Sequence, residues 1–192
     1  MGMVYIFLAD GFEEIEALAT LDMLRRGGVT VKTVSITERQ AVLGAHGVKV
    51  EADWTYGDFK SIAGFDGWNP EDVLVFPGGM PGAKNLSEKQ DLVRTANIHF
   101  AMGGTVAAIC AAPGLVVSRL DGIEGRRFTC FDGFEGMLTA KGAEYERKMV
   151  VTDGNLITGR GPGCAVEFGL AILESIKGKD EAERVRSGLM IC

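Results

Sequence analysis

Hydrophobic and polar positions along the chain predict short buried strands that alternate with amphipathic helices. Runs that are apolar throughout, or at every second position, predict strands at residues 3–9, 29–36, 73–76 and 106–109. A helical pattern begins at Phe12 and ends at Arg25-Arg26, where a basic last turn and Gly27-Gly28 stop the helix. A strand, a helix and a strand in this order predict a right-handed crossover and a parallel sheet.

The other segments extend this alternation and add two hairpins. Short β-like pieces around Gly44–Gly47 predict a hairpin excursion at about residues 40–52, and Asp153-Gly154 predicts a second hairpin between 149–152 and 155–158. Further elements are predicted as a strand at 127–131 and helices at 87–101 (with Ser87 as N-cap), 165–176 and 179–189. Residues 53–72, with Trp54 and Trp68, are predicted to be irregular. The order predicts a doubly wound α/β sandwich, organised as a single domain over residues 1–192 with C-terminal helices at about 164–190.

Composition is typical of a globular protein and excludes several functional classes. Of the 192 residues, 46% are hydrophobic and 24% are charged, which suits one domain with a proper core. The net charge of −6 and the absence of a basic cluster predict no binding to nucleic acid or to an anionic membrane. No apolar run has membrane-spanning length, and the N-terminus lacks a signal-peptide pattern. We therefore expect a cytoplasmic protein with reduced thiols.

Ligands of doubly wound folds bind beyond the carboxyl ends of the parallel strands. Four loops should meet there, at residues 10–16, 77–82, 110–114 and 160–163. The third loop places Cys110 between a buried strand and a helical segment, followed by the small residues Ala111 and Ala112. A tight strand-to-helix corner needs small neighbours, and unpaired N–H groups at a helix N-terminus favour a thiolate. The pattern predicts a nucleophile at Cys110, and the alternative is a buried structural cysteine.

The other loops offer groups that can assist such a nucleophile. Glu16 lies among apolar residues of the first helix, so burial should raise the pKa of its carboxyl. Gly78 and Gly79 allow a close backbone approach, and the N–H of Gly79 can form an oxyanion site with that of Ala111. A simpler interpretation is that the two glycines end a strand. Arg160 lies in a glycine-rich turn that is expected to line the site.

Histidine, the usual base beside a catalytic cysteine, is absent from the corner itself. His99 follows a helical pattern and is expected at a helix end or at the surface, whereas His46 lies on the hairpin and can reach a neighbouring subunit. The four cysteines form no CxxC pair, so the sequence predicts no metal site of the usual zinc spacing.

Taken together, four segments resemble the ThiJ/PfpI superfamily, and within it the branch of the parkinsonism-associated deglycase and its bacterial relatives. They are Leu8–Glu16, Phe76–Ala83, Ala107–Pro113 and Thr158–Gly163. The resemblance implies a flavodoxin-like three-layer α/β/α sandwich with a nucleophile elbow, and a homodimer. It also implies a nucleophilic or oxidisable Cys110, a protonated Glu16 as its partner, and oxyanion donors at Gly79 and Ala111. Activities implied are deglycation of methylglyoxal adducts, glyoxalase action without a cofactor, redox sensing and chaperone-like holding.

Two positions depart from related sequences. The peptidase branch carries Cys-His-Gly at the elbow, where this chain has Cys-Ala-Ala, and members of the deglycase branch place a histidine where this chain has Phe131. Cys130 is either a resolving thiol or a buried strand cysteine, with the latter favoured.

Three functional hypotheses follow. The first is an enzyme that acts on small reactive carbonyls through Cys110 and Glu16, without a cofactor. The second is a non-catalytic redox sensor or stress protein, because an accessible ionised thiol oxidises selectively. The third is an amidase or peptidase that borrows His46 from a second subunit.

Overall fold

The computed structural model describes residues 2–63 and 69–190, and their central feature is a seven-stranded sheet. In spatial order its strands are β10 (Val150–Asp153), β11 (Leu156–Gly159), β7 (Thr105–Ile109), β6 (Val73–Phe76), β1 (Val4–Leu8), β2 (Val31–Ser35) and β5 (Trp54–Thr55). Neighbouring strands are parallel except β10 and β11, which form the predicted hairpin around residues 153–154. The predicted α/β sandwich with a mostly parallel sheet is confirmed.

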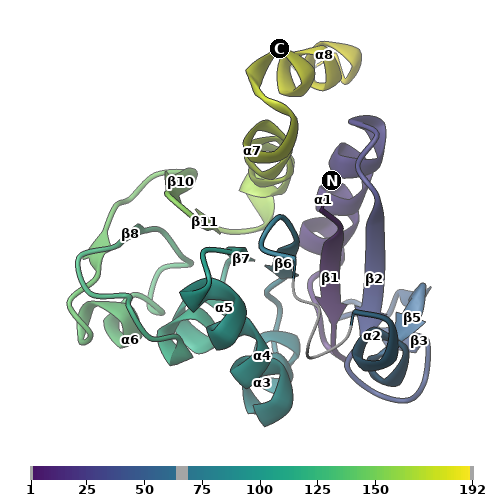
Figure 1. Ribbon diagram of the computed structural model, residues 1–192, viewed down its shortest axis with the longest axis horizontal. Helices are drawn as coiled ribbons and strands as arrows, with labels where there is room; N and C mark the ends of the chain where they lie inside the picture. Colours follow the sequence, from purple (N-terminus) through teal and green to yellow (C-terminus); the bar gives the residue numbers. More distant parts are fainter. Residues whose placement is uncertain (1, 64–68, 191–192) are drawn as a thin grey trace.

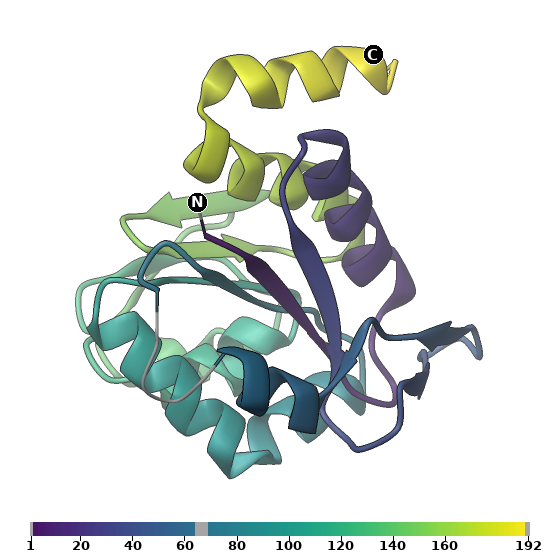
Figure 2. The ribbon, with the colours of Figure 1, turned by 45° about the vertical axis from the view of Figure 1, so that its right-hand side comes forward.

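Helices cover both faces of the sheet (Figures 1 and 2). One face carries α1 (Glu14–Arg26) and α7 (Ala165–Lys177), and the other carries α2 (Tyr56–Ala63), α3 (Gly82–Glu88), α4 (Gln90–Ala101) and α5 (Ala112–Leu115). Strand β1 contributes side chains to both hydrophobic cores, because successive side chains of a strand point to opposite faces of the sheet. Tyr5 and Phe7 pack towards α2, whereas Ile6 and Leu8 belong to the core beneath α1 and α7.

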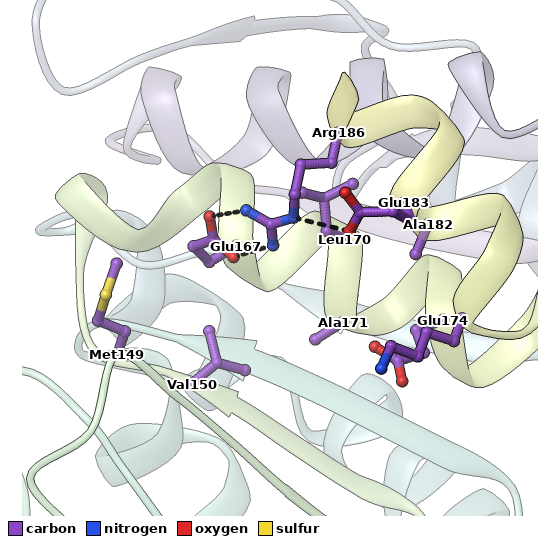
Figure 3. A pocket seen from close by; sticks show the side chains of 10 residues that line it. Met149, Val150, Glu167, Leu170, Ala171, Glu174, Ala182, Glu183 and Arg186 are labelled. Carbon is purple, nitrogen blue, oxygen red and sulfur yellow. Dashed lines mark hydrogen bonds and ion pairs between the residues drawn. The ribbon is translucent and has the colours of Figure 1, made fainter. Parts of the chain in front are cut away.

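The C-terminal helix α8 (Lys179–Gly188) packs on α7 and follows it closely, as predicted. Arg186 of α8 makes a bidentate ion pair with Glu167 of α7 and a further one with Glu183 (Figure 3). A pocket of about 470 Å³ lies between these two helices and the edge strand β10. No predicted site residue lines this pocket.

Two small sheets lie outside the central one. The first is the predicted hairpin of β3 (Ala41–Leu43) and β4 (Lys49–Glu51), which extends from the body in Figure 2. The second pairs β8 (Arg127–Phe128) with β9 (Glu144–Tyr145), beside α6 (Gly136–Thr139). Two 3-10 helices, η1 (Val117–Arg119) and η2 (Pro162–Cys164), complete the described elements.

Several predicted elements differ from the structure. The strand expected at 127–131 ends at Phe128, because the backbone of Thr129 then turns to hydrogen bond the Thr158 side chain. Ser87 caps no helix: it lies inside α3, donates to the Lys84 carbonyl, and α4 begins only at Gln90.

The segment predicted to be irregular contains β5 and α2, because Tyr56 and Phe59 bury aromatic rings against the sheet. Trp54 contacts Tyr5 in a tilted arrangement, with ring centroids 6.0 Å apart, whereas Trp68 lies outside the described residues. His99 ends α4 as expected but is buried, where its Nε2 lies 3.0 Å from the Asp72 carbonyl.

Candidate active site

Cys110 occupies a strained corner between β7 and α5. Its φ of 66° lies in the left-handed region, which costs a non-glycine residue about 1–2 kcal/mol. Hydrogen bonds on both sides hold this geometry: its N–H donates to Gly159 (2.9 Å), and its carbonyl accepts from the Phe131 N–H (2.9 Å). The half-buried side chain touches both hydrophobic cores, so the sulfur lies where the two layers meet at the end of the sheet.

Glu16 approaches this cysteine from the first turn of α1. Its side chain is only 1% exposed, and Oε2 accepts a 2.7 Å hydrogen bond from the Gly78 N–H. Its Oε1 has no hydrogen-bond partner within the described part of the chain. The Cys110 thiol lies close enough to the carboxyl to affect its pKa. A buried carboxyl with one unpartnered oxygen, close to a thiol, can exchange a proton with it.

Gly78 and Gly79 fit closely between these two side chains. A Cβ on Gly78 would lie 2.6 Å from Cys110 Cβ and 2.7 Å from Glu16 Oε2, so a larger residue cannot occupy this position. Gly79 has a φ of 86°. Its N–H and that of Ala111 lie close enough to the Cys110 sulfur to lower the pKa of the thiol. The structure therefore brings Cys110, Glu16, Gly78, Gly79 and Ala111 together.

Burial governs the protonation of this pair. It raises the pKa of Glu16 to about 7, although hydrogen bonds from Cys110 and Gly78 oppose the shift. Burial, followed by the nearby Glu16 carboxylate, raises the pKa of the Cys110 thiol to about 12. The amides of Gly79 and Ala111 offset only part of this increase.

The expected raised pKa of Glu16 is thus confirmed, whereas the expected lowering of the thiol pKa is wrong. The helix after Cys110 is a single turn of four residues, so its dipole is weak and cannot outweigh burial. The contribution of Glu16 depends on its charge: the protonated carboxyl no longer repels a thiolate and can donate to it.

His46 lies on the hairpin turn and is 70% exposed. Its ring atom Nδ1 is 2.8 Å from Glu14 Oε2 and 3.6 Å from Glu13 Oε2. The backbone N–H of His46 donates to Glu14 Oε1 (2.8 Å). The carboxylate of Glu14 therefore anchors the hairpin to α1, a role that its position in the first turn of a helix does not reveal. Donor atoms of Glu13, Glu14 and His46 lie within 4.8 Å of one another, a set that could coordinate a cation.

Phe131, Cys130 and Arg160 lie outside the cluster around Cys110, and the pocket that Phe131 and Arg160 share includes neither Cys110 nor Glu16 in its lining. The Phe131 side chain is 47% exposed and lines a pocket of about 340 Å³ together with Asp132, Arg160 and residues 161–164. Arg160 donates to both carboxylate oxygens of Asp132 at 2.8 Å. Cys130 is fully buried, and burial raises the pKa of its thiol to about 12, so it is a core cysteine rather than an accessible second thiol. Asp132 and Cys164 also line this pocket, and no sequence motif marks either of them.

A parallel sheet that holds a cysteine at a strained strand-to-helix corner, beside a buried carboxyl, defines an α/β protein with a nucleophile elbow. Residues 3–175 match the sequence profile of the DJ-1/PfpI family, and the chain belongs to this family. The resemblance inferred from the four motifs is confirmed.

Three relatives cover nearly the whole chain. Protein dj-1beta of Drosophila melanogaster is 34% identical over 189 residues, which make up 97% of this chain and 95% of the fly protein. The glutathione-independent glyoxalase DJR-1.2 of Caenorhabditis elegans is 31% identical over 93% of this chain and 90% of its own. Protein DJ-1 homolog A of Arabidopsis thaliana is 34% identical over 98% of this chain, which spans only 46% of the plant protein.

Solved structures agree with the fold. The structure of oxidized Toxoplasma gondii DJ-1 aligns over 100% of both chains with a TM-score of 0.89 and 28% identity. Drosophila melanogaster DJ-1beta aligns over 100% of this chain and 98% of its own, with a TM-score of 0.84 and 34% identity. In the described part of the chain, no helix is long and apolar enough to cross a membrane.

Proposed function

We propose that the protein is a cysteine-dependent enzyme that converts small 2-oxoaldehydes, or their early adducts, without a cofactor. The observation that carries the proposal is the contact between the Cys110 thiol and the buried Glu16 carboxyl, whose pKa of about 7 suits proton transfer at neutral pH. A relative that shares 31% identity is named as a glutathione-independent glyoxalase, which supports the same class of reaction.

The chemistry begins with formation of a carbon–sulfur bond. The sulfur of Cys110 adds to the aldehyde carbon while its proton passes to Glu16, and the N–H groups of Gly79 and Ala111 stabilise the developing oxyanion. Glu16 returns that proton to the oxyanion, which gives a hemithioacetal.

Two proton transfers between adjacent carbons of the bound substrate complete the reaction. Glu16 removes the proton from the former aldehyde carbon, and a proton is delivered to the neighbouring ketone carbon through an enediol. The product is a thioester of a 2-hydroxy acid, and water hydrolyses it to release the acid and the free thiol. One carbon is oxidised and its neighbour is reduced, so the substrate and water balance the reaction.

The test is the formation of lactate from methylglyoxal by purified protein. Cys110→Ser should abolish turnover, since a hydroxyl is a much weaker nucleophile at this corner, whereas Cys192→Ser removes a thiol by the same substitution and should leave turnover intact. Unchanged turnover in Cys110→Ser refutes the role of the sulfur.

A redox sensor is the second candidate, supported by the partial exposure of Cys110 and by the oxidised state named for the Toxoplasma gondii relative. Oxygen addition at Cys110 at low peroxide, measured by intact mass, together with no turnover of any carbonyl, would favour this function. A peptidase that borrows His46 from a second subunit finds less support, because Glu14 engages the His46 imidazole within the chain.

We also propose that the protein acts as a homodimer. Exposed apolar side chains stand on α1, at Ile15 and Leu18, and on the hairpin, at Leu43 and Val48. The Gly11 N–H donates to the Leu43 carbonyl (2.7 Å), so the hairpin and the start of α1 are joined. Large exposed apolar side chains on joined elements are typical of a protein interface, and a second copy is the partner that the family resemblance implies.

A further inference from the structure

The carboxylate of Glu13 does not cap the helix that it precedes. Glu13 is the N-cap residue of α1, where a side-chain oxygen commonly accepts a hydrogen bond from an N–H of the first turn, yet its side chain makes no such bond. The side chain is only 13% exposed, and in the described part of the chain its one ion pair joins Oε2 to Nδ1 of His46, 3.6 Å away. A largely buried carboxylate without a hydrogen bond favours a nearby cation.

Glu14 and His46 complete a set of three possible metal ligands. Nδ1 of His46 lies 2.8 Å from Glu14 Oε2, and the donor atoms of all three residues lie within 4.8 Å of one another. In a tetrahedral zinc site, with ligand atoms about 2.1 Å from the ion, neighbouring ligand atoms are about 3.4 Å apart. The separations of 2.8 Å and 3.6 Å at Nδ1 bracket that value, so small side-chain movements suffice to admit an ion.

Hydrogen bonds of the backbone hold the hairpin and the start of α1 in this arrangement. The Ala45 N–H donates to the Phe12 carbonyl (2.8 Å), and the His46 backbone N–H donates to Glu14 Oε1 (2.8 Å). Gly44 leaves room for that carboxylate, because a Cβ there would lie 2.2 Å from Oε1. One oxygen of Glu14 is thus fixed by the hairpin while Oε2 faces the imidazole, and the 70% exposed His46 side chain can be reached by an ion from solvent.

The charges and the donor types both favour zinc. Two ionised carboxylates meet one imidazole, so the set stays negative whether the ring is neutral or protonated. A metal ion that replaces the shared proton takes the Nδ1 lone pair, leaves the other ring proton on Nε2 and neutralises both carboxylates. An imidazole ligand favours zinc over magnesium, which prefers oxygen ligands alone.

We propose that Glu13, Glu14 and His46 form a Zn²⁺ site that links the hairpin to the start of α1, with water as the fourth ligand. The spacing of cysteines and histidines in the sequence predicts no such site, because Glu14 and His46 are 32 positions apart and meet only in the folded chain.

Titration with zinc chloride, followed by isothermal calorimetry, tests the site. The parent protein combines Cys110→Ser, Cys164→Ser and Cys192→Ser, so that thiolates do not compete for the ion. It should bind one zinc ion per chain, and magnesium chloride should give no comparable binding. Absence of saturable zinc binding, or magnesium binding of equal affinity, overturns the proposal.

Two ligand variants of this parent assign the site. Glu13→Gln keeps the Glu14 anchor of the hairpin, and His46→Asn removes the imidazole. Each should raise the Kd for zinc at least about tenfold, a loss that is seen even when only the partners of metal ligands are changed. Glu51→Gln, which removes an exposed carboxylate on β4 of the same hairpin, should leave the Kd unchanged. A smaller effect of either ligand variant, or an equal effect of Glu51→Gln, overturns the assignment.

Ring-proton NMR of the parent protein tests the same site without a ligand substitution. Zinc should shift the ring signals of His46 and leave those of the buried His99 in place. Unshifted His46 signals at saturating zinc overturn the proposal. Because the parent carries Cys110→Ser, all these outcomes are independent of whether the proposed carbonyl reaction takes place.

Discussion

The N–H of Gly78 donates a 2.7 Å hydrogen bond to Oε2 of Glu16, and this contact orients the carboxyl, whose Oε1 has no hydrogen-bond partner in the described part of the chain. The two residues are 62 positions apart in the chain. Because Gly78 follows β6 and Glu16 belongs to α1, the contact exists only when the sheet and the helix are both in place. The proposed catalytic role of Glu16 depends on this hydrogen bond.

The pH profile tests the role of Glu16 as a base. The carboxyl must be ionised to accept the thiol proton, and burial raises its pKa to about 7. Accordingly, kcat/KM for methylglyoxal should be low below about pH 7 and should rise as the pH increases through this value. Glu16→Gln should lower kcat/KM about 100-fold or more and remove this limb of the profile. A profile that is flat between pH 6 and pH 8 contradicts the assignment.

Stability should show the opposite dependence on pH. The pKa of Glu16 is higher in the folded state than the ordinary value of 4.5, so its contribution to stability is complete below pH 4.5 and is lost as the pH rises through about 7. The loss amounts to about 3 kcal/mol. Glu16→Gln cannot ionise, so its free energy of unfolding in urea should fall less between pH 5 and pH 8. The exposed Glu51→Gln serves as the control, and an equal fall in all three proteins would disprove the prediction.

Gly78→Ala should damage both activity and folding. The new methyl group would lie within 2.7 Å of both Cys110 Cβ and Glu16 Oε2, so one of the two side chains must move. We expect a loss of about 1–3 kcal/mol in the free energy of unfolding, as for overpacked cores, together with a large fall in kcat. Gly136→Ala is the matched control, since nothing lies within 4 Å of a Cβ at that position. Similar behaviour of the two variants would mean that the corner is less tightly packed.

The pKa values of the two histidines should be shifted in opposite directions from the ordinary value for histidine. The Glu14 hydrogen bond raises the pKa of His46, whereas burial lowers the pKa of His99. Ring-proton NMR should therefore show one imidazole above the ordinary value and one below it. Glu14→Gln should return the pKa of His46 towards its ordinary value and leave that of His99 in place. A His46 that already titrates normally in the wild type would indicate that the hairpin anchor is absent in solution.

A charge on the apolar face of α1 should dissociate the proposed dimer. Ile15→Asp places a carboxylate on the exposed apolar surface proposed as the interface, and burying it against a partner is costly. Sedimentation should show a monomer for Ile15→Asp and a dimer for the wild type and for Met102→Asp, whose site is exposed elsewhere. A wild-type protein that sediments as a monomer rejects the dimer outright.

The amino-acid sequence alone determined the strand–helix alternation and the identity of the main residues of the candidate site. Buried strands such as β1 and β7 are apolar runs, and Cys110 among small residues marks a tight corner, so both features follow from local pattern. The helix α2 could not be found in the same way, because the burial of Tyr56 and Phe59 depends on a sheet that is formed by distant segments.

Tertiary structure decided the electrostatics of the site and the shape of the pocket beside Phe131. Local sequence indicated that a helix follows Cys110, but not that it is one turn long or that burial would raise the thiol pKa. Likewise, the pairing of Arg160 with Asp132, which leaves an apolar pocket beside Phe131, joins residues 28 positions apart. Burial and charge pairing depend on everything that surrounds a group, and most of those neighbours come from other parts of the chain.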